Sequence, residues 1–118
     1  MSYLPMEVSL SKGATQKFSR IKQRTGITPN LMGRVALMKS LESGIKVVDL
    51  KPVESVGQKI PKDIFFGDDS DIYELAVELY AKENEYTGDI KELVNQLVDN
   101  GAHNIPSIKS IADLDSLI

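Results

Sequence analysis

Residues 24–44 read RTGITPNLMGRVALMKSLESG, and this stretch decides the fold. Gly26 can adopt the left-handed conformation on which helices often end. Thr28 suits the N-cap of a following helix, because its hydroxyl can accept a hydrogen bond from a free backbone N–H. Pro29 suits the first helical position, where its missing N–H costs nothing. The stretch therefore predicts the end of one helix, a tight turn and a second helix over 29–43.

The residues before this stretch predict a short strand and a first helix. Apolar and polar side chains alternate within residues 3–10, with the two-residue period of a half-buried strand. An isolated strand of this size is not stable, and one solution is pairing with the same strand of a second subunit. In residues 12–24, Ala14, Phe18 and Ile21 share one helical face. The chain is thus expected to begin with a strand and two helices.

A neighbouring face of the first predicted helix is basic. Its cations are Lys17, Arg20 and Arg24, and Lys12 and Lys22 add charge at its margins. No acid lies between Lys12 and Arg34, so these cations have no partner nearby in the sequence. Most charged helical faces are simply solvated, but the lack of interleaved Asp or Glu favours contact with phosphate.

Charge is also distributed unevenly along the whole chain. The 118 residues carry a formal net charge of −3. Residues 1–62 hold 11 Lys and Arg against 4 Asp and Glu, a net charge of +7, whereas residues 63–118 hold 3 against 13, a net charge of −10. The basic half suggests a polyanionic partner. The alternative is that the two halves neutralise each other, within a subunit or between subunits.

The second predicted helix, over 29–43, is apolar on nearly every side. Such a helix must be covered on several sides, and a small protein with few helices has few elements of its own to cover it. We therefore expect subunits to associate through it. The residues expected in the oligomer core are Leu31, Val35, Leu37, Met38 and Leu41. Gly33 lies inside this helix and either permits a close helix approach or has no special role.

The second half of the chain predicts further helices. Residues 45–67 mix prolines and glycine with apolar residues and predict an ordered connector with little regular structure. A helix capped by the polar residues at 68–71 follows. Its expected core face is Ile72, Leu75, Ala76, Leu79 and Tyr80. Another helix, capped by Asp89 or Thr87, is expected to end near Gly101, and a short docked helix to close the chain.

These elements predict one mainly α domain over 1–118. Within it, 1–44 is a ribbon-helix-helix-like DNA-binding unit of one strand and two helices, 45–67 is the connector and 68–118 is a helical, acidic part. No apolar run is long enough to span a bilayer, and no charged-then-apolar leader opens the chain. We therefore expect a cytoplasmic protein with no membrane partner.

Few residues of the chain are suited to catalysis. It has no cysteine, which excludes thiolate metal sites and a cysteine nucleophile. His103 is the single histidine, and a lone histidine in a predicted turn is more often a surface polar group than a catalyst. No Gly-rich phosphate loop or metal-binding His/Glu pair is present. The sequence predicts a binding protein rather than an enzyme, with no metal and no cofactor.

The order of strand, basic helix, turn and apolar helix is that of ribbon-helix-helix DNA-binding modules. In those modules the strands of two subunits pair, and the N-terminus of the second helix faces phosphate. Thr28 and Asn30 stand at that helix start here. The outward strand residues would include Glu7, a poor neighbour for DNA, so backbone contact fits better than base readout. A ribbon-helix-helix transcriptional regulator or antitoxin is the alternative function.

The run from Ile21 to Gly44 is similar to the signature of the DndE family, the small E subunit of the bacterial Dnd system for DNA phosphorothioation. Its most telling core is RTGITPN, followed by Arg34 and by SLESG at 40–44. Looser matches extend through Phe66-Gly-Asp, the helix at 73–80, Asp99-Asn-Gly101 and the closing Ile111-Ala-Asp-Leu.

The resemblance implies a subunit without a catalytic role. It would bind double-stranded DNA, preferably nicked, through a basic surface on an oligomer, and a tetramer has been described for the family. Its partners would be the ATPase-like and iron–sulfur subunits of a system that replaces a non-bridging phosphate oxygen with sulfur. The family's basic residues would map onto Lys17, Arg20, Lys22, Arg24 and Arg34. With Lys12, Thr28 and Asn30 they form the predicted DNA-binding set. A third hypothesis is an assembly adaptor whose acidic half docks a basic partner and never touches DNA.

Overall fold

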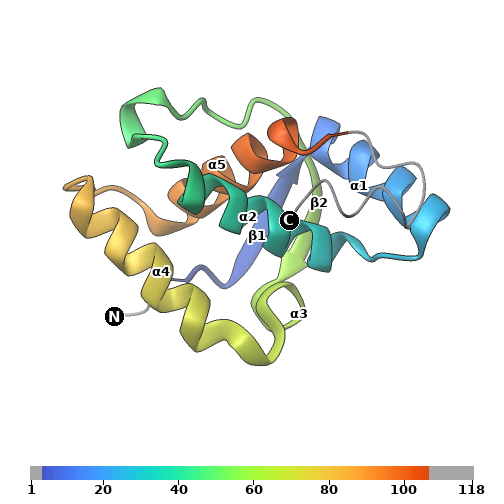
Figure 1. The fold of residues 1–118 in the computed structure, drawn as a ribbon, viewed down its shortest axis with the longest axis horizontal. Helices are drawn as coiled ribbons and strands as arrows, with labels where there is room; N and C mark the ends of the chain where they lie inside the picture. The colour runs from blue at the N-terminus through green and yellow to red at the C-terminus, as the bar shows by residue number, and fades with distance from the viewer. Residues whose placement is uncertain (1–3, 107–118) are drawn as a thin grey trace.

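The computed structural model describes residues 4–106 (Figure 1). Its helices are α1 (Lys12–Thr25), α2 (Pro29–Ser43), α3 (Lys62–Phe66), α4 (Ser70–Glu83) and α5 (Ile90–Asn104), with short 3-10 turns at Val47–Asp49 and Gly67–Asp69. Two strands, β1 (Glu7–Ser11) and β2 (Val56–Pro61), form an antiparallel sheet. The prediction of a mainly α fold that begins with a strand and two helices is confirmed.

The turn between α1 and α2 follows the local chemistry of its residues. Gly26 has φ 81°, and its N–H donates to the Lys22 carbonyl at 2.8 Å, which closes α1. Pro29 takes the first position of α2, and Gly44 ends that helix with φ 73°. Thr28 holds the predicted N-cap position, but its side chain makes no capping hydrogen bond. The expected role of the Thr28 hydroxyl is therefore wrong, whereas the helix boundaries are right.

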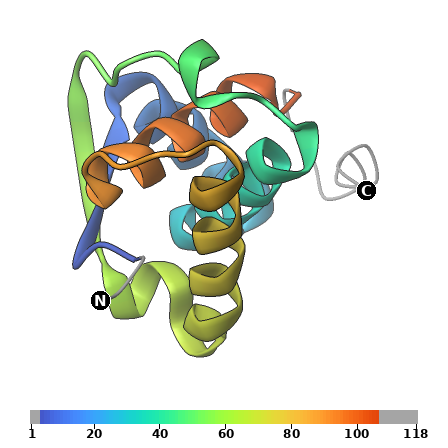
Figure 2. The same cartoon turned by 90° about the vertical axis from the view of Figure 1, so that its left-hand side faces the viewer.

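β1 pairs with β2 of the same chain rather than with a second subunit. Val8 lies opposite Ile60, and Figure 2 shows both strands along one side of the molecule with the helices gathered on the other. Pairing between subunits, which the sequence left open as one solution, is not how β1 is paired. The prediction of little regular structure in 45–67 is wrong, because this range holds β2 and α3. The sequence of β2 gives a weak strand signal. Val56 and Ile60 are its only large apolar residues, and Pro61 is a poor strand former.

The centre of the core is the contact between α2 and α5. The buried Ser40 hydroxyl of α2 donates to the Leu97 carbonyl at 2.5 Å and accepts from the Asn100 amide at 2.9 Å. Gly101 lies where the two backbones meet, because a Cβ there would sit 1.8 Å from the Ala36 carbonyl oxygen. The prediction that this helix ends near Gly101 is wrong. The glycine permits close helix packing, and α5 continues past it.

α4 turns a different face to the core from the one that its sequence indicated. Its buried residues are Val77, Tyr80 and Ala81. Its exposed apolar residues are Ile72, Leu75 and Leu79, at 64%, 57% and 52% exposure. The prediction is therefore wrong for these three and correct for Tyr80. The helix carries two apolar stripes, and periodicity alone does not tell which of them meets the rest of the chain.

The predicted terminal helix falls on residues 107–118 and lies outside the described residues. Between residues 4 and 106, the structure contains no helix that combines the length and apolarity needed to cross a membrane.

Candidate nucleic-acid interface

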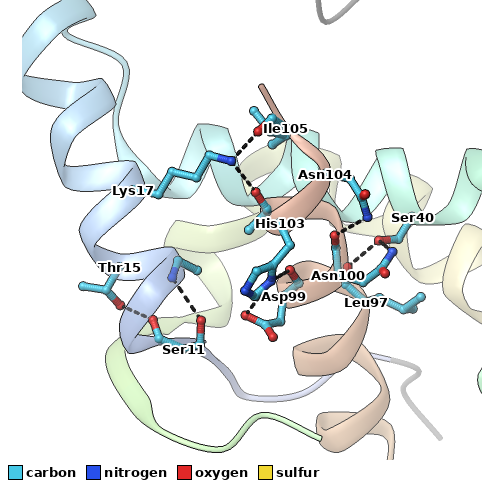
Figure 3. A network of polar contacts seen from close by, with 12 residues as sticks. Ser11, Thr15, Lys17, Ser40, Leu97, Asp99, Asn100, His103, Asn104 and Ile105 are labelled. Carbon is cyan, nitrogen blue, oxygen red and sulfur yellow. Dashed lines mark hydrogen bonds and ion pairs between the residues drawn. The ribbon is translucent and has the colours of Figure 1, made fainter. Parts of the chain in front are cut away.

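The orientation of α1 is fixed by its cap and by its apolar face. The Ser11 hydroxyl accepts the Ala14 N–H at 3.0 Å, and the Thr15 hydroxyl donates to the Ser11 carbonyl at 2.8 Å (Figure 3). Ala14, Phe18 and Ile21 are buried, as the sequence predicted. These contacts set the rotation of the helix about its axis, so the opposite face of α1 is held toward solvent.

The solvent face of α1 is cationic and has no acid on it. Its exposed cations are Lys12, Arg20, Lys22 and Arg24. The ion pairs found within residues 4–106 include none from α1. Lys22 and Arg24 stand in the last turn, where the helix dipole favours positive charge. The four side chains, called here the α1 basic face, present charge that is not neutralised within the described chain; Lys22 stands at the margin away from Arg20 and Arg24.

A depression of about 320 Å³ lies between α1 and the end of α5. Its polar lining comes from Lys17, Arg20, Arg24 and His103. The sequence predicted a turn at His103, but this residue stands in the last turn of α5, with Nδ1 2.7 Å from the Asp99 carbonyl. The only sequence signal that could have placed His103 in a helix is the helical spacing of the apolar residues before it. Gly101 interrupts that spacing. The volume of the depression exceeds that of a phosphate group, and its lining includes several cationic hydrogen-bond donors.

Lys17 lies at the inner edge of this depression and is half-buried. Its ammonium donates to the Ala102 carbonyl at 2.8 Å and to the Ile105 carbonyl, both at the end of α5 (Figure 3). Burial lowers the pKa of the Lys17 ammonium from its ordinary value of 10.5. The group satisfies carbonyls that α5 leaves without helical partners. Contact of Lys17 with phosphate stays a prediction, and its ammonium already has two internal acceptors.

The predicted phosphate contacts at the start of α2 are also engaged within the chain. Arg34 donates to the Phe65 carbonyl through Nε and to the Ile64 carbonyl through Nη2 at 3.1 Å. The Asn30 amide donates to the same Ile64 carbonyl at 3.2 Å. Thr28, two residues before Asn30 in the sequence, is half-buried. These bonds fasten α3 across α2, which gives Asn30 and Arg34 a structural role that local sequence did not indicate.

The residues predicted for an oligomer core divide between the interior and the surface. Leu37 has 0% exposure inside its own chain, so its assignment to a contact between subunits is wrong. Leu31 is 44% exposed. The half-buried members are Val35, Met38 and Leu41. Leu31, Val35 and Met38 line a depression of about 360 Å³ together with Tyr73 of α4. An apolar surface therefore remains on α2 once the chain has folded.

The fold and this surface define a small, mainly helical protein with a strand-helix-helix start and a cationic first helix. A family model described as DNA sulphur modification protein DndE matches residues 7–113. The chain therefore belongs to the DndE family, and the resemblance seen in the sequence is confirmed. No curated protein matches the chain.

Two solved structures show the same fold. The crystal structure of DndE from Escherichia coli, described as involved in DNA phosphorothioation modification, is 27% identical, with a TM-score of 0.64 over 85% of this chain and 95% of that chain. The crystal structure of a DndE mutant described as involved in DNA phosphorothioation is 21% identical, with a TM-score of 0.64 over 86% of this chain and 97% of that chain. The second likeness concerns the fold alone.

Proposed function

We propose that this chain is a non-catalytic subunit of the DNA sulfur-modification machinery. It binds double-stranded DNA, with nicked DNA preferred, through α1 on a homo-oligomer. Family membership supports the pathway. The observation that carries the DNA-binding step is the α1 basic face, four exposed cations on a helix without an acid. Such a face attracts the phosphate backbone independently of base sequence.

The strand at the start of the chain does not support base readout. β1 is paired with β2, and the Ser9 N–H donates to the Asn95 side chain of α5 at 3.0 Å. Glu7, on the same strand, forms an ion pair with Lys91 at 3.0 Å. β1 is therefore paired and bonded within its own chain, whereas a ribbon-helix-helix regulator pairs this strand with a second subunit. Contact with the DNA backbone through a helix is the function that this arrangement favours.

We propose that the chain acts as a homo-oligomer, a tetramer, because one copy offers few phosphate contacts. Four exposed cations on a chain of net charge −3 give weak binding at physiological salt. The apolar surface of α2 at Leu31, Val35 and Met38 is the proposed contact between copies. Association there would bring several α1 basic faces onto one duplex. ATPase-like and iron–sulfur subunits in the cytoplasm are the further partners that we propose.

The test is a gel shift on nicked and intact duplexes at several salt concentrations. The variant Arg20→Glu, Lys22→Glu, Arg24→Glu reverses three cations of the α1 basic face and leaves the internally bonded Lys17 unchanged. Each lost phosphate contact lowers the slope of log affinity against log salt by about 0.9. We expect affinity to fall at least ~10-fold and the slope to flatten by up to about 3 for each copy whose α1 basic face contacts the duplex.

A matched control reverses three exposed lysines elsewhere, so that the net charge changes equally. Its substitutions are Lys46→Glu, Lys51→Glu and Lys59→Glu. Circular dichroism verifies that both variants are folded. Equal loss of binding in both variants would show that overall charge, not the α1 basic face, governs binding. No loss in the α1 variant, or no binding by the wild type, contradicts the proposal.

A further inference from the structure

α4 carries an apolar stripe that no other part of the described chain covers. Ile72, Leu75 and Leu79 are 64%, 57% and 52% exposed and stand at i, i+3 and i+7. This spacing places them on one side of a helix, one above the other. In Figure 1, α4 runs along the outer edge of the molecule. These three residues are called here the α4 stripe.

The α4 stripe cannot turn inward, because the opposite side of α4 is anchored. The Tyr80 hydroxyl donates to the Ile45 carbonyl at 2.7 Å, and Tyr80 is 6% exposed. The Tyr73 ring packs on Phe66, with ring centroids 5.6 Å apart. Asn84, at the end of the helix, accepts the Val47 N–H at 3.2 Å. Contacts at both ends and the middle fix the rotation of α4, so its second apolar side is a stable surface feature.

The surroundings of the α4 stripe are strongly acidic. Residues 68–85 contain seven Asp and Glu and one Lys, a net charge of −6. The lysine is Lys82, which is paired with Glu78 at 3.3 Å. Asp71 and Glu78 follow the stripe along one margin, at helical spacing. The surface thus combines a central apolar strip with a negative rim, the anatomy of a protein-binding helix face.

Charge determines which occupant fits this surface. DNA is excluded, because its phosphates would meet carboxylates. A second copy that presents its own α4 would place −6 against −6. The α1 basic face of a second copy has the right charge but no apolar side chain to offer, because the apolar residues of α1 are all buried. The exposed side of α2 is apolar, but it carries one cation and one acid, Lys39 and Glu42, and its Arg34 is bonded to α3.

We infer that α4 is a docking surface for a basic amphipathic helix of a partner protein. The partner helix lays an apolar stripe on Ile72, Leu75 and Leu79, and its flanking Lys or Arg side chains meet Asp71 and Glu78. This contact does not use the α1 basic face, so it is independent of the proposed DNA binding. The same small protein thereby holds a nucleic acid with one helix and a protein with another.

The probe is a labelled synthetic peptide with leucines at helical spacing and lysines elsewhere, compared with a scrambled peptide of equal composition. Fluorescence anisotropy should show at least ~10-fold tighter binding of the patterned peptide, equal to about 1.4 kcal/mol. The variant Leu75→Ser, Leu79→Ser should abolish this preference. The variant Asp71→Asn, Glu78→Gln should weaken binding of both peptides and reduce its salt dependence.

The matched control, Met6→Ser with Val48→Ser, removes apolar side chains that are 82% and 86% exposed elsewhere and should bind as the wild type does. Equal binding of the patterned and scrambled peptides, or unchanged binding after the Leu75 and Leu79 substitutions, overturns the inference. A lower mass of that variant in sedimentation also overturns it, because a second copy would then cover the stripe. The variant's gel shift on DNA should match the wild type, which separates this test from that of DNA binding.

Discussion

Replacing Gly101 with alanine should force α2 and α5 apart, although alanine is ordinarily the better helix former. The new Cβ would lie 1.8 Å from the carbonyl oxygen of Ala36, 2.5 Å from its carbonyl carbon and 2.8 Å from its Cα. These are backbone atoms of α2, which cannot rotate away as a side chain would. An ordinary contact begins at 3.4 Å, so the helices must separate by about 1.6 Å at this point.

The cost of this separation exceeds the helix-propensity gain. Alanine in a helix interior is favoured over glycine by about 1 kcal/mol. Overpacking against a rigid neighbour costs roughly 1–3 kcal/mol or more, and loss of the buried bond from Ser40 to the Leu97 carbonyl adds about 1 kcal/mol. With further loss of apolar contact along the interface, we expect a net destabilisation of about 3 kcal/mol. At about 4 °C per kcal/mol, the Tm falls by about 12 °C.

Thermal unfolding followed by circular dichroism measures this effect, with Gly13→Ala as the matched control. Gly13 also lies in a helix, but its new Cβ would meet only the Ser11 hydroxyl, at 3.9 Å. That variant should be more stable by about 0.5–1 kcal/mol, because alanine restricts the unfolded chain. A Tm for Gly101→Ala at or above that of the wild type would refute the packing argument, and so would equal losses in the two variants.

Three further substitutions test polar contacts. Ser40→Ala should lower the free energy of unfolding by about 1–3 kcal/mol in urea titrations, since it leaves buried partners on α5 unpaired. Burial raises the pKa of the Tyr80 phenol above its ordinary value of 10.0, so its contribution to stability is present below pH 10 and is lost as the pH rises through the raised pKa. Tyr80→Phe should remove this alkaline loss in urea titrations from pH 8 to 11, and should cost about 1 kcal/mol at neutral pH through its bond to Ile45. The hydrogen bond from Lys91 lowers the pKa of Glu7 below 4.5, so its contribution is present above pH 4.5 and is lost as the pH falls; Glu7→Gln should flatten the acid limb of the same titration.

Features set by residues close in sequence were predictable. The turn between α1 and α2 depends on what Gly26 and Pro29 permit in their own backbone, and both residues act as expected. The buried face of α1 follows from three apolar residues at one spacing, with no competing stripe on the helix. Asp89 caps α5 by accepting the Lys91 N–H at 3.1 Å. In each case the deciding interaction spans four residues or fewer, or a single helical face.

Features set by distant residues were not predictable in the same way. β2 has few strand-forming residues and exists as a strand because β1 lies beside it. In the sequence, Gly101 is typical of a helix end. Its actual role, close packing against the backbone of α2, depends on a helix far away in the sequence. α4 offers two apolar stripes, and its contacts with α2, with α3 and with the segment at 45–47 select the buried one. The outcome of each depends on what packs against the element, which a local pattern does not encode.

The candidate DNA-binding residues likewise divide into those whose placement depends on nearby residues and those whose placement depends on distant ones. The cations of the α1 basic face are exposed because the apolar residues of α1 hold the opposite side against the core. Lys17 belongs to the same charged run, but its acceptors lie 85 and 88 residues away at the end of α5. Arg34 likewise finds its acceptors on α3. The basic helix could be predicted from the sequence, but only the packed chain separates cations that serve the fold from cations that remain available.

The opposite charges of the two halves are directed outward rather than at each other. Within residues 4–106, no ion pair joins a cation of the basic half, 1–62, to an acid of the acidic half. The one ion pair between the halves, from Lys91 to Glu7, has the reverse polarity and leaves the asymmetry larger on both sides. Direct ion pairs between residues 4–62 and 63–106 therefore do not neutralise the charge difference between the halves. Positive charge on α1 and the net negative charge of the residues around the α4 stripe instead favour two separate partners of opposite charge, whose binding should weaken together as salt rises but respond to different substitutions.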